Sequence, residues 1–262
     1  MSLRLHIIPD ELLPRYMVEV GGDVQQHFEA LQDSELSIDT FSFYTSVSAV
    51  FSSKIEGEDI ELDSYIRHKR LGAHFLPDYT RKTDDLYEAY TYAQQHPLTE
   101  AGIAHCHSLI TRHILQEAQQ GRVRAGNMFV ITKDGRIEYV AAAPAVAKPA
   151  MQALYADIAT LLDAELTFKE VLFYAAMIHL VFVKIHPFED GNGRTARLLE
   201  KWFLAQKLGP KAWFIQSERY YYEQHQQYYT NIRHLGLEYD TLDYTQALPF
   251  LLMLPQSVVP QV

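Results

Sequence analysis

The sequence predicts a mainly α-helical fold, a helical bundle around a central buried helix with one β-hairpin. Three observations indicate this class. Apolar side chains recur at helical spacing along most of the 262 residues. The run 171–183 is apolar except for His179, which is the pattern of a helix buried on every side. The segment 128–140 instead has short β-rich runs on both sides of a turn.

The N-terminal part of the chain is expected to be helical after an irregular start. Within residues 1–30 the pattern predicts one short helix. Asp84 and Asp85 stand in the first turn of a later helix, where acidic side chains interact favourably with the helix dipole, and Pro97 ends the region. The other helices predicted in this part cover residues 35–56, 60–72, 83–95 and 99–117.

A hairpin is predicted next. The runs 128–132 and 137–140 are rich in β-forming residues, and they flank a turn that contains Asp134 and Gly135. Asp-Gly between such runs is a strong hairpin signal, because this pair adopts the positive φ angles of tight turns. A loop rich in alanine and proline is expected over residues 141–149.

The second half of the chain is again helical by its apolar spacing. One helix begins at the glycine-rich turn 191–193 and stops before Gly209 and Pro210, which are typical helix-ending residues. The other helices predicted here cover residues 150–164, 168–185, 217–235 and 240–254.

Composition and charge narrow the class of function. A hydrophobic content of 48% is that of a globular protein, and 262 residues allow one large core. The net charge of −10 argues against non-specific binding to nucleic acid, which requires a basic surface.

The location of the protein is predicted from cysteine content and from apolar segments. Cys106 is the one cysteine, so no disulfide forms within the chain, as suits a reducing compartment. The first ten residues lack the apolar stretch of a signal peptide, and the run 171–183 is too short to span a membrane. We therefore expect a cytoplasmic protein that binds neither membranes nor nucleic acid.

The most informative segment is 186–197, which directly follows the central apolar run. Gly191, Asn192 and Gly193 form a turn whose backbone angles are closed to most residues, and whose N–H groups can converge on an anion. Helical spacing resumes after the turn. The turn therefore lies at a helix N-terminus, where free N–H groups and the helix dipole favour phosphate.

Four side chains of the same segment add to this phosphate site. Arg194 and Arg197 are three residues apart, so they share a helix face and can donate charge-assisted hydrogen bonds to phosphate. Asp190 suits Mg²⁺, which takes one or two carboxylates and completes its shell with phosphates and water. His186 titrates near neutrality and can take a proton from an attacking hydroxyl.

These residues resemble the signature of the Fic family, His-x-Phe-x-Asp/Glu-Gly-Asn-Gly-Arg-x-x-Arg, and every specified position matches. The resemblance extends over residues 100–235. It implies a Fic-type helical bundle that transfers a nucleoside monophosphate, most often AMP from ATP, to a hydroxyl side chain of a target protein. The organisation it implies is one compact unit with an N-terminal helical region over 1–95, a Fic catalytic core over 96–235 and a helical tail over 236–262.

The resemblance also implies a role for each residue of the signature. His186 becomes the general base, and Asp190 becomes the ligand of a Mg²⁺ ion that bridges the phosphates of ATP. The residues that it assigns to nucleotide binding, in the turn and on the helix after it, are Gly191, Asn192, Gly193, Arg194 and Arg197.

A second match lies far upstream, in residues 52–57, which read Ser-Ser-Lys-Ile-Glu-Gly. It resembles the family's inhibitory motif, Ser/Thr-x-x-x-Glu-Gly/Asn. Helical spacing before it places Glu56 near a helix end, with Gly57 as the stop. In the family this glutamate pairs with the second signature arginine, here Arg197. The chain thus resembles the self-inhibited class whose inhibitory helix precedes the catalytic core.

The predicted hairpin also has a counterpart in the family, a flap that covers the active site and binds the target segment by strand addition. Val130 and Ile131 are the residues expected to dock the target. Tyr228, Tyr229 and Asn231, after the signature helix, are candidates for the adenine pocket. His105 and His107 lie two residues apart and face different sides of a helix, so we expect core packing of one of them and no shared metal.

Several alternatives stay open at this point. Glu56 would also serve an enzyme that removes AMP from a modified protein, by positioning the attacking water. A non-catalytic module that senses a nucleotide would use the same turn. The partners expected are ATP and an unidentified target protein, and the oligomeric state is open, with a homodimer as one alternative.

Overall fold

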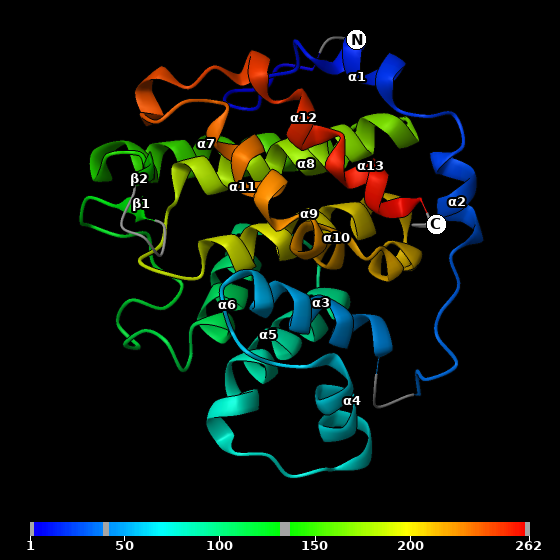
Figure 1. The fold of residues 1–262 in the computed structure, drawn as a ribbon. Helices are drawn as coiled ribbons and strands as arrows, with labels where there is room; N and C mark the ends of the chain where they lie inside the picture. Colours follow the sequence, from blue (N-terminus) through cyan, green and yellow to red (C-terminus); the bar gives the residue numbers. More distant parts are fainter. Residues whose placement is uncertain (1–2, 39–41, 132–136, 260–262) are drawn as a thin grey trace.

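The computed structural model describes residues 3–38, 42–131 and 137–259. It confirms the predicted class, since these residues form a mainly helical fold with one antiparallel hairpin. α8 (Phe168–Ile185) runs through the middle of the molecule (Figure 1), and its residues from Val171 onward are all buried. The helices packed against it are α1 (Leu13–Glu19), α7 (Pro144–Asp163), α9 (Asn192–Leu208), α12 (Leu248–Leu251) and α13 (Met253–Val258).

Both ends of α8 are defined by local chemistry. At its start Thr167 accepts a hydrogen bond from the Glu170 N–H, and the Glu170 side chain accepts one from the Thr167 N–H, which is a complete capping box. At its end His186 adopts a left-handed conformation with φ 51°. The chain therefore leaves α8 in a sharp turn that leads into α9.

A second group of helices packs on the other side of α9, in the lower part of Figure 1. It consists of α3 (Phe43–Ile55), α4 (Leu62–Leu71), α5 (Pro77–Gln95) and α6 (Glu100–Ile110). α3 also packs against α10 (Ser217–Glu223). Glu56 is the C-cap of α3, and Gly57 follows with a φ of 90°, as expected for a glycine stop. The remaining helices are α2 (Val24–Ala30) and α11 (His225–Arg233).

The hairpin consists of β1 (Phe129–Ile131) and β2 (Ile137–Val140). The strands are antiparallel, with Val130 opposite Tyr139. Val140 also forms a parallel bridge with Glu238, so the chain after α11 covers the outer side of β2. The predicted turn at Asp134 and Gly135 lies outside the described residues.

Several predicted boundaries in the first two thirds of the chain are wrong. α3 starts at Phe43, because Ser42 caps the helix and accepts a hydrogen bond from the Thr45 N–H at 3.2 Å. α5 starts earlier than predicted, at Pro77, and α6 ends earlier, at Ile110. The predicted loop 141–149 is largely helix, since α7 begins at Pro144 and includes Pro149. Pro144 stands in the first turn, where proline costs no helical hydrogen bond, whereas Pro149 lies inside the helix and removes the bond that an N–H there would donate to the Ala145 carbonyl.

The C-terminal predictions also need correction. The single helix predicted over 217–235 is two helices, α10 and α11, separated at Gln224. The region 240–254 consists of two short 3₁₀ turns followed by α12 and the start of α13. Within the residues described, we find no helix with the length and apolar content that a membrane crossing requires.

Candidate active site

The predicted site lies in the loop that joins α8 to α9. Gly191 is the N-cap of α9, with a φ of 77°, and a Cβ there would lie 2.7 Å from the Thr111 side chain. Asn192 closes the loop from inside, because its Oδ1 accepts from the Phe188 N–H at 2.9 Å and its Nδ2 donates to the Phe188 carbonyl at 2.8 Å. Both polar atoms of the Asn192 side chain therefore bind the loop backbone.

His107 of α6 binds the same loop through a ring nitrogen and by ring stacking. The Gly121 N–H donates to its Nδ1 at 2.8 Å, so the ring proton is on Nε2, which donates to the Asp190 carbonyl at 2.9 Å. The ring stacks on Phe188 at 3.7 Å between centroids. Burial lowers the pKa of His107 to about 4, so the ring is neutral at pH 7. The predicted packing of one of the clustered histidines is confirmed, but its bond to the loop was not foreseen.

His186, the predicted base, is half-buried at the end of α8. Its Nδ1 lies 3.0 Å from the Tyr139 hydroxyl. Burial lowers the pKa of His186 to about 4, and the nearby charge of Arg124 contributes. The expected titration near neutrality is therefore wrong, and the imidazole is unprotonated at pH 7, as a proton acceptor must be.

Arg124 shapes the path of the chain around His186, a function that the sequence did not reveal. Its Nε donates to the His186 carbonyl at 2.7 Å, and its Nη2 donates to the carbonyls of Ala142 and, at 3.4 Å, Ile185. Its own N–H donates to the Pro187 carbonyl at 2.8 Å. One buried guanidinium thus joins the end of α8 to the start of α7.

Asp190 and Arg194 are paired with each other. Arg194 Nη2 donates to Asp190 Oδ1 at 2.8 Å, and the Gly191 N–H donates to the same oxygen. The Asp190 side chain is 48% exposed, whereas that of Arg194 is 6% exposed. The buried Nε of Arg194 has no hydrogen-bond partner among the described residues. A buried donor without a partner is costly, so this guanidinium is suited to bind a further acceptor.

Arg197 is buried and reaches the end of α3. Its Nη2 donates to Glu56 Oε1 at 2.6 Å and to the Ser52 carbonyl at 3.1 Å. Its Nε donates to Ser52 Oγ at 2.8 Å. The Tyr228 hydroxyl is a weaker partner, 3.4 Å from Nη1. The structure therefore brings together the two motifs that the sequence analysis paired, residues 52–57 and 186–197.

The Glu56 carboxylate also lies against the glycine turn. A Cβ on Gly193 would be 2.5 Å from Glu56 Oε1, so only glycine leaves room for the carboxylate. Burial acts to raise the pKa of Glu56, but the charges of Arg197 and Arg194 outweigh it and the pKa is lowered. Glu56 is therefore ionised at pH 7.

A cavity of about 520 Å³ opens beside Glu56, between the end of α3, the hairpin and α11. Val130 and Ile131 line it, as does Tyr229. Tyr228 and Asn231 do not line it, and both are buried. The other residues that line the cavity are Lys54, Ile55, Gly57, His225, Gln226 and Arg233.

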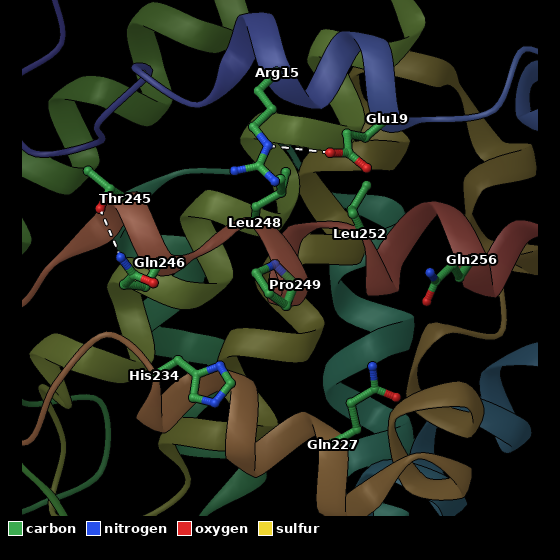
Figure 2. Close-up of a pocket in the computed structure, with 10 residues that line it drawn as sticks. All are labelled: Arg15, Glu19, Gln227, His234, Thr245, Gln246, Leu248, Pro249, Leu252 and Gln256. Carbon is green, nitrogen blue, oxygen red and sulfur yellow. Dashed lines mark hydrogen bonds and ion pairs between the residues drawn. The ribbon is translucent and has the colours of Figure 1, made fainter.

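A second hollow of about 450 Å³ lies elsewhere, between α1, α11 and α12, and Figure 2 shows its lining. Arg15 and Glu19 form an ion pair at 3.3 Å on its α1 side. None of the predicted site residues lines it. The cavity beside Glu56 is therefore the one that belongs to the candidate active site.

Comparison with known proteins finds similar sequences and similar folds. Residues 97–204 match the model of the Fic/DOC family. A segment of 49 residues is 47% identical to the protein adenylyltransferase Fic of Aedes aegypti. That segment is 19% of this chain and 10% of the relative, so the chain matches only a small part of that protein.

Two solved structures share the fold. A Fic family protein from Desulfovibrio desulfuricans superposes with a TM-score of 0.73 at 20% identity, over 97% of this chain and 75% of that one. A Fic domain containing signaling protein from Bacteroides thetaiotaomicron gives a TM-score of 0.63 at 20% identity, over 95% of this chain and 91% of that one. At such identities the likeness concerns the fold alone.

Proposed function

Residues 97–204 of this chain form a domain of the Fic/DOC family, and on that premise we propose that the protein transfers AMP from ATP to a hydroxyl of a target protein. Glu56 inhibits this transfer. The observation that carries the proposal is the ion pair of Arg197 with Glu56, in a site that also contains a neutral histidine and a glycine turn. A purely structural loop would not require these groups together.

The chemistry is an in-line displacement at the α-phosphorus of ATP. His186 Nε2 takes the hydroxyl proton while the hydroxyl oxygen forms a bond to the α-phosphorus. The bond from the α-phosphorus to the bridging oxygen breaks, and pyrophosphate leaves with the electron pair. The turn N–H groups stabilise the developing charge, together with Arg194, whose buried Nε lacks a partner among the described residues.

Asp190 fits a Mg²⁺ ion held jointly with the phosphates. Its side chain is half exposed, so the carboxylate is accessible to a bound ion. The same residues contain no cluster of three or more histidine, cysteine or acidic side chains that could hold a metal alone. This suits Mg²⁺, which needs few carboxylates. When bound, the ion would neutralise phosphate charge.

Glu56 inhibits by occupying Arg197. The γ-phosphate of ATP would otherwise accept the hydrogen bond that Nη2 donates to Glu56 Oε1. The carboxylate also lies on Gly193, where its charge repels phosphate. ATP bound beside it would have a displaced α-phosphate, and misplacement of the reacting atoms is costly in rate.

The hairpin is proposed to bind the target. The outer side of β2 is bridged to Glu238, which leaves β1 as the edge for strand addition. Val130 and Ile131 line the cavity, and Phe129 and Ile131 are 50% and 57% exposed. An extended target segment on β1 would bring its hydroxyl near His186, and Val130 and Ile131 would contact it.

A second candidate function is removal of AMP from a modified protein. The observation that favours it is that Glu56 is ionised and borders the cavity, where it could orient an attacking water. The two reactions place opposite demands on Glu56. Transfer increases when Glu56 is removed, whereas removal of AMP is lost.

The test uses wild type, Glu56→Gly and Glu56→Gly/His186→Ala with Mg²⁺ and ATP labelled at the α-phosphate. Glu58→Gly is the matched control, because this neighbouring acid pairs with Lys82 at 2.7 Å and not with the site. Label is expected on the Glu56→Gly protein only. A pre-modified protein incubated with wild type and Glu56→Gly tests the second candidate, and release of AMP by wild type alone would favour it.

A further inference from the structure

We propose that Tyr139 is a positioning residue for this reaction, whose hydroxyl holds the His186 ring in the tautomer with a free Nε2 lone pair. The same contact joins the base to the hairpin. The inference rests on the proposed function, since it concerns the base of that reaction.

The geometry places one phenol between two partners. Tyr139 Oη donates to the Val183 carbonyl at 2.9 Å and lies 3.0 Å from His186 Nδ1. Both are ordinary hydrogen-bond distances. The Tyr139 side chain is buried, and its ring meets the His186 ring edge-on at 71°.

The number of protons then determines the tautomer. A carbonyl only accepts, so the single phenolic proton of Tyr139 points to Val183. Oη can offer only lone pairs to His186 Nδ1, which must therefore carry the ring proton. Neutral imidazole has one N–H, so Nε2 keeps its lone pair. Nε2 is the atom that must accept the proton of the attacking hydroxyl.

The Val183 carbonyl accepts a hydrogen bond from Tyr139, and it also acts against burial to raise the pKa of His186 through a hydrogen bond with its ring. Both contacts favour a proton on Nδ1. The last carbonyls of a helix have no partner within the helix. Arg124 binds those of Ile185 and His186, and Tyr139 binds that of Val183. The Tyr139 hydroxyl therefore donates to the end of α8 and not to His186 Nδ1. The hydrogen bonds run from His186 Nδ1 to Tyr139 and from Tyr139 to Val183.

The Tyr139 ring is itself held in place. Lys184 Nζ lies 4.5 Å from the ring centroid and donates to the Gly236 carbonyl at 3.1 Å. On the same strand the Val140 N–H donates to the Leu237 carbonyl at 2.7 Å. Across the hairpin Tyr139 stands opposite Val130, which lines the cavity. β1, the strand that would bind the target, is thus paired directly with Tyr139, the residue that orients the base.

The experiment compares Tyr139→Phe with Tyr16→Phe, both in the Glu56→Gly background. Tyr16 is the matched control, because its hydroxyl is buried but has no hydrogen-bond partner in the described part of the chain. Nitrogen-15 NMR of histidine-labelled protein reports which ring nitrogen of His186 is protonated, with His186→Ala to assign the signals. Steady-state kinetics separate kcat from KM for ATP.

In the Glu56→Gly protein, the parent of both variants, we expect His186 to have a protonated Nδ1 and an unprotonated Nε2. Tyr139→Phe is expected to shift the Nε2 signal toward the average of the two tautomers. It is also expected to lower kcat at least tenfold with little change in KM for ATP, a part of the roughly 10²–10⁴-fold that a general base contributes. Tyr16→Phe should change neither quantity.

Two results would overturn the inference. One is a proton on Nε2 in the parent protein, which requires no variant and so is independent of whether Tyr139→Phe folds. The other is a Tyr139→Phe protein with an unchanged His186 spectrum and unchanged kcat. Absence of transfer in the parent protein would contradict the proposed function instead, and the tautomer would still test Tyr139.

Discussion

Arg197 and Glu56 are 141 residues apart in sequence, yet Arg197 Nη2 lies 2.6 Å from Glu56 Oε1. Arg197 is buried, and the Glu56 side chain is 27% exposed at the edge of the cavity. The exposed partner is therefore the one that can withdraw, whereas the arginine stays in place, where we propose that it binds phosphate. This asymmetry is what a reversible inhibitory contact requires.

The pH dependence of stability should report the Glu56 ion pair. The pKa of Glu56 is lowered from its usual 4.5, because the charges of Arg197 and Arg194 outweigh burial, with a smaller effect of His186. A lowered folded-state pKa means that the stabilisation is present above about pH 4.5 and is lost as the pH falls through the folded-state value. The difference in free energy of unfolding between wild type and Glu56→Gln should thus be constant near neutrality and disappear in acid. A difference that grows in acid would contradict the assignment.

Ser52 is expected to support the inhibited state. Its hydroxyl binds Arg197 Nε at 2.8 Å, and a hydrogen bond to a charged group contributes about 1.5–3 kcal/mol. Ser52→Ala should lower the free energy of unfolding by that amount and raise self-modification, because Arg197 is held less firmly toward α3. Ser53→Ala is the matched control, since Ser53 is equally buried but binds Thr83. Equal self-modification by the two variants, measured by incorporated label, would rule out this role.

Local signals allowed much of the site to be predicted. The apolar run of α8, the glycine turn and the Gly57 stop each depend on neighbours in sequence, and all three are present in the structure. Proline misled the prediction of α7, because Pro149 was interpreted as a loop residue although it lies inside the helix.

Contacts between distant elements could not be predicted in this way. His107 and Asp190 are 83 residues apart, and Tyr139 and His186 are 47 apart. Packing of α6 and of the hairpin against the α8–α9 loop brings these pairs together, and no local pattern encodes that packing. For the same reason the sequence did not reveal that the Asn192 side chain closes the loop by binding Phe188.

His107 is predicted to determine the shape of the α8–α9 loop, where we propose that phosphate binds. His107→Phe keeps an aromatic ring on Phe188 but removes the bonds to the Asp190 carbonyl and the Gly121 N–H. We expect the free energy of unfolding to fall by about 1–3 kcal/mol, because buried polar groups lose their partners. ATP affinity, measured by calorimetry, should fall as well. His105→Phe is the control, because His105 is exposed, and unchanged ATP affinity in His107→Phe would refute the prediction.

Gly191 is predicted to be irreplaceable for a steric reason. Its φ of 77° strains any residue with a Cβ, and that Cβ would meet the Thr111 side chain at 2.7 Å. Gly191→Ala should lower the free energy of unfolding by about 1–3 kcal/mol. Gly126→Ala is the control, since a Cβ there has open space and no positive φ. Chemical denaturation of both variants tests the difference, and equal stabilities would show that the loop adapts.

The most direct test of the central claim is the intact mass of Glu56→Gly and of Glu56→Gly/His186→Ala after incubation with Mg²⁺ and ATP. The account predicts an added AMP on Glu56→Gly, with none on the double variant and little on wild type. Addition of AMP in wild type and Glu56→Gly to the same extent would contradict inhibition by Glu56. No addition in any variant that still binds ATP would contradict the proposed transfer.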